Sequence, residues 1–181
     1  MIEKLRGSRV LDFSAGWGDR LVGAAAAKTV LSYQAFDPNT DLIPGHTAII
    51  ERLVDEPRRK NFSVIYEPAQ HVELPYGRTY DLIFTSPPFF DLEIYTDKAG
   101  QSVLDFTTRD AWLVGFLFVC FRKFWKVLEF GGHMAIHMSD DWNHNGATGT
   151  FWAGACCVLA VCAVLRTCCR CDGPWDGRGR P

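Results

Sequence analysis

The alternation of short apolar segments with helical segments, joined by short links, is the feature of this sequence that most constrains its fold. Alternation of this kind is typical of βαβ units, in which parallel strands form a sheet that helices cover on both faces. We therefore expect an α/β fold with a doubly wound, mainly parallel sheet. Strands are predicted at residues 9–13, 33–36, 62–66, 80–85 and 133–138, and helices at residues 21–28, 42–54 and 108–128.

The alternation ends near residue 145, and the rest of the chain has a different composition. We predict one domain over residues 1–145, followed by an atypical tail over residues 146–181 that is rich in Cys, Gly, Trp and Arg. The cysteine spacing in the tail matches no zinc-finger pattern well, so we predict no metal site. A buried helix or strand around Val158 to Leu165, followed by a disordered end, fits the composition better. A shifted reading frame or an alternative splice end would produce such a tail.

The overall charge is close to neutral. The formal net charge is −2, with 48% hydrophobic and 22% charged residues, as in soluble globular proteins. With no overall basic field, contact with a nucleic acid would depend on a local patch. No secretory signal is visible, and no apolar run reaches the ~20 residues of a membrane span. We expect an intracellular protein, cytoplasmic or nuclear, without a membrane partner.

The first two predicted strands both end in residues suited to ligand binding. In a doubly wound sheet, ligands bind at the carboxyl ends of the strands. The first strand leads into D-F-S-A-G-W-G, in which Gly16 and Gly18 allow a tight turn and close approach of a ligand. Asp37, at the end of the second strand, is placed to bind ribose hydroxyls. Each feature alone also fits an ordinary turn, but together they favour an adenosine-type ligand.

The ligand is not expected to carry a pyrophosphate. Leu21 stands where the dinucleotide fingerprint has its third glycine, and no Gly-Lys-Ser/Thr of a P-loop follows. A ligand with a ribose and no phosphate therefore fits this loop better.

The fourth predicted strand ends in S-P-P-F-F, residues 86–90. Proline cannot donate to a sheet ladder and keeps the residue before it extended, so this strand end is rigid. The segment is either a strand terminator with aromatic rings packed beneath it or a surface that binds a planar group.

Together these segments resemble a known family. Residues 12–20, D-F-S-A-G-W-G-D-R, resemble motif I of the class I S-adenosylmethionine-dependent methyltransferases, in the form found in the amino-methylating branch. Ser86-Pro87-Pro88-Phe89 resembles motif IV of that branch: Asp, Asn or Ser, then Pro-Pro, then Tyr or Phe. The resemblance spans residues 9–140 and none of the tail. The sequence departs from the pattern at Phe13 and Ser14, which replace Pro-Phe, and at Trp17, where the family usually has a small residue.

The resemblance implies a Rossmann-like class I methyltransferase fold with S-adenosyl-L-methionine as its cofactor. That fold closes its sheet with an antiparallel hairpin after the fifth strand. No convincing hairpin is visible here, so we expect the fold to be incomplete at its C-terminal end. The implied cofactor-binding residues are Asp12, Ser14, Ala15, Gly16, Trp17, Gly18, Asp37 and Glu67.

The resemblance also assigns the catalytic segment, Ser86, Pro87, Pro88 and Phe89. The Ser86 hydroxyl and the Pro87 carbonyl would accept the two hydrogens of an exocyclic amine, which aims the nitrogen lone pair at the methyl group. Phe89 would stack on the base, and Phe90 either walls the pocket or fills the core. His133 and His137 are interpreted as residues of the core strand, not as ligands.

The implied activity is methylation of a nucleobase amino group in DNA or RNA, at adenine N6 or cytosine N4. The base would have to be flipped out or single-stranded. Two alternatives stay open. One is a methyltransferase acting on guanine N2 or on a protein glutamine amide, and the other is an inactive, truncated cofactor-binding fold.

Overall fold

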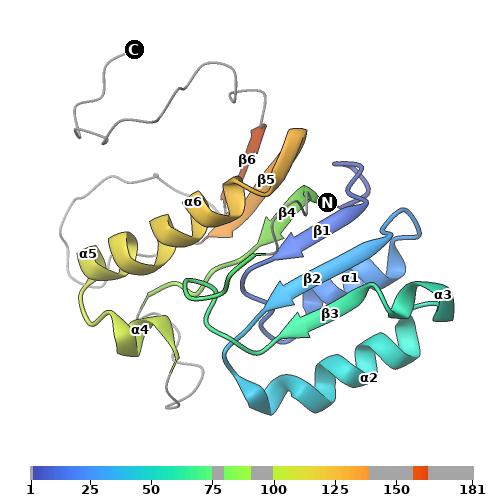
Figure 1. Ribbon diagram of the computed structural model, residues 1–181, viewed down its shortest axis with the longest axis horizontal. Coiled ribbons are helices and arrows are strands. Elements are labelled where there is room, and N and C mark those ends of the chain that lie inside the picture. Colours follow the sequence, from blue (N-terminus) through green and yellow to red (C-terminus); the bar gives the residue numbers. More distant parts are fainter. Residues whose placement is uncertain (1, 75–79, 91–99, 139–156, 163–181) are drawn as a thin grey trace.

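The computed structural model describes residues 2–74, 80–90, 100–138 and 157–162, which form a six-stranded sheet with helices on both faces (Figure 1). The strand order is β3-β2-β1-β4-β5-β6. β1 to β5 are parallel, and β6 runs antiparallel to β5. The predicted doubly wound, mainly parallel sheet is thereby confirmed. The strands are β1 (Arg9–Asp12), β2 (Ser32–Phe36), β3 (Phe62–Ile65), β4 (Tyr80–Thr85), β5 (Leu128–Met138) and β6 (Cys157–Cys162).

The helices connect the strands in the order that the alternation predicts. α1 follows β1, and the short turn η1 leads into α2 and α3 between β2 and β3. α4, α5, η2 and α6 lie between β4 and β5. Their bounds are α1 (Asp19–Ala26), η1 (Thr40–Leu42), α2 (Ile43–Leu53), α3 (Glu56–Arg59), α4 (Ser102–Asp105), α5 (Arg109–Trp112), η2 (Leu113–Leu117, π-helical) and α6 (Phe118–Trp125).

The two faces of the sheet bury different residues because side chains alternate along a strand. Val10 of β1 and Leu82 of β4 belong to a core shared with α1, whereas Leu11 and Ile83, their neighbours, belong to a core with α5, η2 and α6. Large aromatic rings dominate the second core. Phe13 stacks on Phe124, with ring centroids 5.0 Å apart. The sheet is therefore held rigidly from both sides, and its strand ends are fixed in position.

The strand order reverses beside β1. β1 pairs with β2 on one side and with β4 on the other, so the chain winds outward in both directions from this point. The connections that leave β1 and β4 diverge here, which opens a crevice at the carboxyl ends of the two strands. The loops after β1, β2 and β4 that the sequence singles out all lie at this edge.

The region before β5 differs from its prediction. The predicted helix 108–128 is divided into α5, the π-helical η2 and α6, and it ends at Trp125. β5 begins at Leu128, so Phe130-Gly131-Gly132 lies inside the strand. The β4–β5 register shifts between Tyr80 and Leu82, and Gly131 has a φ of 81°. These glycines accommodate an irregularity in the ladder, which periodicity cannot distinguish from a helix stop.

Part of the predicted tail belongs to the sheet. β6 pairs with β5 from His133↔Cys162 to Met138↔Cys157, near the strand or helix expected at residues 158–165. An antiparallel strand after β5, which the sequence did not reveal, is thus present. The remainder of the segment 146–181 lies outside the described residues.

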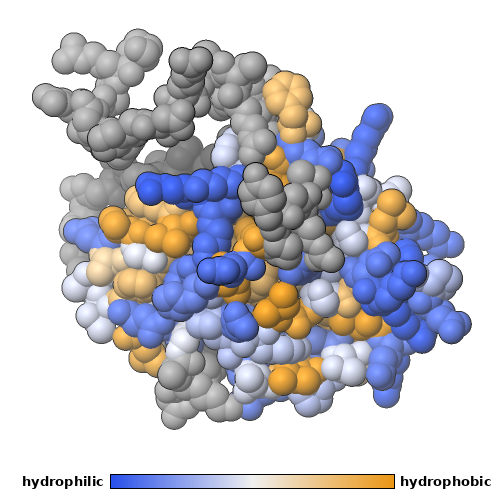
Figure 2. All heavy atoms as spheres, in the orientation of Figure 1, coloured by the Kyte–Doolittle hydropathy of each residue, from blue (hydrophilic) through white to orange (hydrophobic). Residues whose placement is uncertain are grey.

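The described residues show neither a membrane-spanning helix nor a metal-binding cluster. No helix in these ranges has the length and apolar character to cross a bilayer. In the same ranges, no group of three His, Cys, Asp or Glu side chains is arranged to hold a metal ion. Figure 2 shows hydrophobic residues interspersed among hydrophilic ones on the visible face.

Candidate functional site

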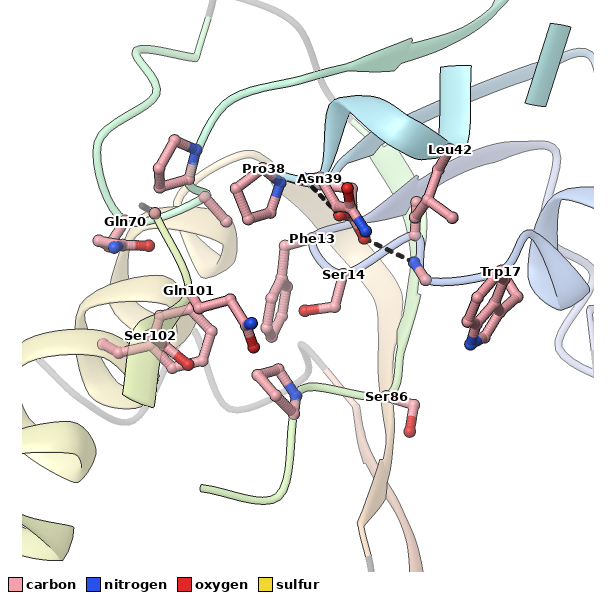
Figure 3. Close-up of a pocket in the computed structure, with 18 of the residues that line it drawn as sticks. Phe13, Ser14, Trp17, Pro38, Asn39, Leu42, Gln70, Ser86, Gln101 and Ser102 are labelled. Carbon is pink, nitrogen blue, oxygen red and sulfur yellow. Dashed lines mark hydrogen bonds between the residues drawn. The ribbon is translucent and has the colours of Figure 1, made fainter. Parts of the chain in front are cut away.

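A pocket of about 250 Å³ lies at the carboxyl ends of the central strands (Figure 3). It brings together eight of the twelve predicted site residues: Ser14, Ala15, Gly16, Trp17, Asp37, Ser86, Pro88 and Phe89. Asp12, Gly18, Glu67 and Pro87 are not among the lining residues. The segments after β1, β2 and β4, far apart in the sequence, therefore form one site.

The glycine loop after β1 adopts a backbone that favours glycine. Gly16 and Gly18 have φ angles of 55° and 96°. A side chain at Gly18 would also place its Cβ 2.8 Å from Ile49 Cδ1 of α2. A glycine at position 18 therefore suits both the turn and the packing against α2, and it is not among the residues that line the pocket.

Asp37 holds this loop from the end of β2. Its Oδ2 accepts the Gly16 N–H at 2.8 Å, and its Oδ1 accepts the Asn39 N–H at 2.9 Å (dashed lines in Figure 3). Burial raises the pKa of the Asp37 carboxyl, and the two backbone donors and His46 partly offset that rise. Each carboxylate oxygen keeps lone pairs free for a further donor, such as a ribose hydroxyl.

His46 of α2 is a supporting residue that the sequence analysis missed. Its Nε2 lies 2.9 Å from the Gly16 carbonyl oxygen, and its Nδ1 lies 2.9 Å from the Tyr66 hydroxyl. Because a carbonyl oxygen only accepts, Nε2–H is the donor to Gly16, and Nδ1 makes the hydrogen bond with the Tyr66 hydroxyl. His46 is almost completely buried, so both polar groups of the Gly16 residue are fixed by side chains. An isolated histidine on an amphipathic helix gives no sequence signal of this role.

The prediction that Asp12 contacts the ligand is not supported by its position. Asp12 is fully buried. Its Oδ2 accepts from Arg20 Nε at 2.7 Å and from the Tyr33 hydroxyl at 2.9 Å, and its Oδ1 accepts from the Ser14 N–H. Arg20 also donates to the Ser14 carbonyl oxygen. Asp12 therefore holds the base of the glycine loop from below.

Glu67 is exposed, and Gln70, three residues further on, occupies the pocket instead. Gln101 enters the pocket from the segment before α4. Both glutamines are more than nine-tenths buried, and neither Nε2 atom has a hydrogen-bond partner within the part of the chain that the structure describes. Because an unpaired buried amide is costly, these two groups point to a polar ligand. The pocket's geometry, not a motif, identifies them.

Gln101 is held in place by its neighbours. Gly100, with a φ of 96°, packs so closely between Pro38 and Pro68 that an added Cβ would lie 3.1 and 3.3 Å from them. On the other side of Gln101, Trp112 Nε1 donates to Ser102 Oγ at 2.9 Å. Figure 3 shows Gln70, Gln101 and Ser102 on one side of the pocket and Trp17 and Ser86 on the other.

The two phenylalanines after the prolines have different environments. Phe90 has a φ of 49°, rare for a residue other than glycine, and its ring packs on the buried Trp112 with centroids 6.0 Å apart. Of the two predicted alternatives for Phe90, the core position is the one observed. Phe89 lines the pocket, as do Ser86 and Pro88, whereas Pro87 is buried.

His137 of β5 contacts both Ser86 and Phe89. Its Nδ1 lies 3.2 Å from Ser86 Oγ, and its ring meets Phe89 edge-on with centroids 6.5 Å apart. The sequence predicts a core position for His137, because strand periodicity does not show which neighbour a side chain reaches.

No family model and no curated protein matches this chain. Many solved structures do match. An rRNA methylase from Streptococcus thermophilus is 15% identical with a TM-score of 0.50, over 77% of this chain and 69% of its own. The N-methyltransferase NodS from Bradyrhizobium japonicum is 12% identical with a TM-score of 0.51, over 76% of this chain and 61% of its own.

TrmN from Thermus thermophilus is 19% identical with a TM-score of 0.50, over 73% of this chain. The match spans 33% of TrmN, so the chain corresponds to about a third of that protein. These similarities establish the fold: the chain has the Rossmann-like fold of the class I methyltransferases.

Removing the buried carboxylate of Asp12 tests its structural role. We expect Asp12→Ala to reduce the free energy of unfolding by about 3–5 kcal/mol, because it leaves the Arg20 guanidinium without its buried partner. Asp55→Ala is the matched control, since Asp55 pairs with Arg58 at 3.1 Å and its side chain is 68% exposed. The control should lose less than about 1 kcal/mol. Urea unfolding followed by circular dichroism measures both, and equal losses would contradict the assignment.

Proposed function

We propose that this protein is an S-adenosylmethionine-dependent methyltransferase that methylates an exocyclic amino group of a nucleobase in DNA or RNA, at adenine N6 or cytosine N4. One observation carries the proposal. A single pocket is lined both by the glycine loop with Asp37 and by Ser86, Pro88 and Phe89. This arrangement supports a methyl donor and a planar amine that meet in one cavity.

The lining residues fit the cofactor. Asp37 has free lone pairs for the ribose hydroxyls, and the amides of Gln70 and Gln101 each offer the donor–acceptor pair that the edge of an adenine complements. Figure 3 shows the glutamines on one side of the pocket, Pro38 and Asn39 above it and Ser86 below on the other side. The base would face the glutamines, the ribose Asp37, and the reactive end Ser86. When bound, the cofactor supplies a methyl group on a sulfonium.

The charges of the pocket favour a ligand without phosphate. Among the described lining residues the one cation is Arg20, which is engaged with Asp12 and the Ser14 carbonyl. Asp19 and Asp37 also line the pocket. Their negative charges would attract S-adenosylmethionine, which carries positive charge at its sulfonium and amino groups.

Ser86, Pro87 and Phe89 are assigned to the acceptor. The lone pair of an exocyclic amine is delocalised into the base, so the amine is a weak nucleophile. Accepting its hydrogens at the Ser86 hydroxyl and a proline carbonyl would aim the lone pair at the methyl group and stabilise the charge that develops on nitrogen. Phe89 would stack on the base, a contact typically worth ~1–3 kcal/mol.

The similar structures support this acceptor class. One is described as an rRNA methylase and another as an N-methyltransferase, so both nucleic-acid and nitrogen acceptors occur on this fold. Guanine N2 and a glutamine amide are planar groups of the same shape and remain alternative acceptors. In the remaining alternative the cofactor binds and no transfer follows.

The raised pKa of Asp37 predicts how cofactor binding depends on pH. Burial raises the pKa of the Asp37 carboxyl, so its protonation begins at a higher pH than that of an exposed aspartate. The ionised form accepts the ribose hydroxyls, so affinity should be full well above this pKa and fall as the pH drops through it. Calorimetric titration with S-adenosylmethionine across this range measures the effect. Asp37→Asn should bind more weakly at neutral pH and lose this pH dependence, and a variant that keeps the wild-type profile would contradict the assignment.

Ser86→Ala and Phe89→Ala should reduce methyl transfer far more than cofactor affinity. We expect rates at least about tenfold lower, since one hydrogen-bond acceptor or one stacking contact is lost, and a cofactor Kd within about twofold of the wild type. Transfer of a tritiated methyl group to DNA, RNA and peptide pools measures the rate.

Phe130→Ala is the control, because Phe130 is a strongly exposed ring on β5 outside the pocket. It should leave both quantities unchanged. Equal losses of rate and affinity in the Ser86 and Phe89 variants would show that the segment is structural, and no binding of S-adenosylmethionine by the wild type would overturn the proposed function.

A further inference from the structure

His137 lies directly behind the residue assigned to the acceptor amine. In the β4–β5 pairing, Phe84 is opposite Ala135 and Thr85 is opposite Ile136. Continuing this register by one residue places Ser86 beside His137, and the 3.2 Å distance from Ser86 Oγ to His137 Nδ1 agrees with it. The contact therefore follows from the pairing of two neighbouring strands in the sheet.

The Ser86 hydroxyl cannot serve as an acceptor without a place for its own proton. A hydroxyl has one hydrogen and two lone pairs. If that hydrogen pointed at the acceptor amine, it would oppose the amine N–H groups. If it is donated to an unprotonated His137 Nδ1, the lone pairs of Ser86 Oγ face the amine.

We propose that His137 is the positioning residue that makes Ser86 a hydrogen-bond acceptor, and that it takes up the proton released by methyl transfer through the Ser86 hydroxyl. This inference rests on the proposed function, because it needs an amine at Ser86. The imidazole also meets the Phe89 ring edge-on, which places it beside both residues assigned to the acceptor amine.

The proton transfer balances. The amine nitrogen forms a bond to the methyl carbon while the carbon–sulfur bond of the donor breaks and its electron pair stays on sulfur. The nitrogen then carries one proton too many. That proton passes to Ser86 Oγ as the Ser86 hydroxyl proton passes to His137 Nδ1. This leaves a neutral methylated amine, a neutral serine and an imidazolium, which returns its proton to solvent.

The test compares His137→Asn with His133→Asn. An asparagine oxygen can accept the Ser86 O–H but cannot take up a proton. The asparagine variant therefore keeps the orientation of the Ser86 hydroxyl and removes only the proton uptake. His133 lies four residues earlier on β5, which places it on the same side of the strand, and it is outside the pocket lining. The rate and KM for acceptor, and the Kd for S-adenosylmethionine, are measured for each protein with a nucleic-acid pool that the wild type methylates. His137→Gln serves as the second variant if His137→Asn does not bind S-adenosylmethionine.

We expect His137→Asn to lower kcat about 100-fold, the size typical of losing general base catalysis, with cofactor Kd and acceptor KM within about twofold of the wild type. His133→Asn should behave as the wild type does. Ser86 and His137 act in the same proton relay, so removing either residue interrupts it. The double variant Ser86→Ala/His137→Asn should therefore be no slower than Ser86→Ala alone.

Two results would overturn the inference while the proposed function stands: a kcat for His137→Asn close to that of the wild type, or losses that multiply in the double variant. Failure of the wild type to transfer a methyl group to any pool would remove the inference together with the proposed function.

Discussion

The peptide groups of Gly16 are the point on which the geometry of the site depends. The Gly16 N–H is held by the Asp37 carboxylate and the Gly16 carbonyl by His46, so the loop after β1 is tied to the end of β2 and to α2 at the same residue. The buried pair of Asp12 and Arg20 holds the loop from below. Because all of these contacts are made by the protein's own residues, the glycine turn is preorganised, and binding costs little ordering of the loop.

The segment from Ser86 to Phe90, on the other side of the pocket, is also held by its neighbours. Phe90 takes an unfavourable backbone conformation, which its ring compensates by packing on Trp112 in the core between the sheet and α5. With one phenylalanine anchored, Phe89 and Ser86 are held at the pocket and braced by His137 from the neighbouring strand. Strain of this kind persists only where the surroundings determine the conformation, and it is frequent at functional sites.

Much of this arrangement could be predicted from the sequence, because its causes are local. Strand periodicity predicted β4 at its observed bounds. Gly16, Asp37 and three residues of the S-P-P-F segment (Ser86, Pro88 and Phe89) line one pocket, as expected for the carboxyl ends of parallel strands. The failures are non-local. A carboxylate beside a glycine loop can contact either a ligand or the protein itself. The sequence therefore could not show that Asp12 is buried and pairs with Arg20.

His46, Gln70, Gln101 and His137 were missed for the same reason. None belongs to a short sequence pattern: His46 and His137 contact residues that are distant in the sequence, and Gln70 and Gln101 are identified by the pocket that they line. His46 is 30 residues from Gly16, and His137 is 51 residues from Ser86. β6 was missed as a closing strand because the composition of the tail obscures its pairing, which depends on the free edge of β5.

The most direct test of the central claim is mass spectrometry of nucleosides from DNA and RNA incubated with the protein and S-adenosylmethionine carrying a deuterated methyl group. If the pocket aims an exocyclic amine at the methyl donor, the label will be found on adenine N6 or cytosine N4, and the Ser86→Ala protein will leave it on neither. Label on a ribose hydroxyl or a ring carbon, or no labelled nucleoside from a protein that binds the cofactor, would contradict the account.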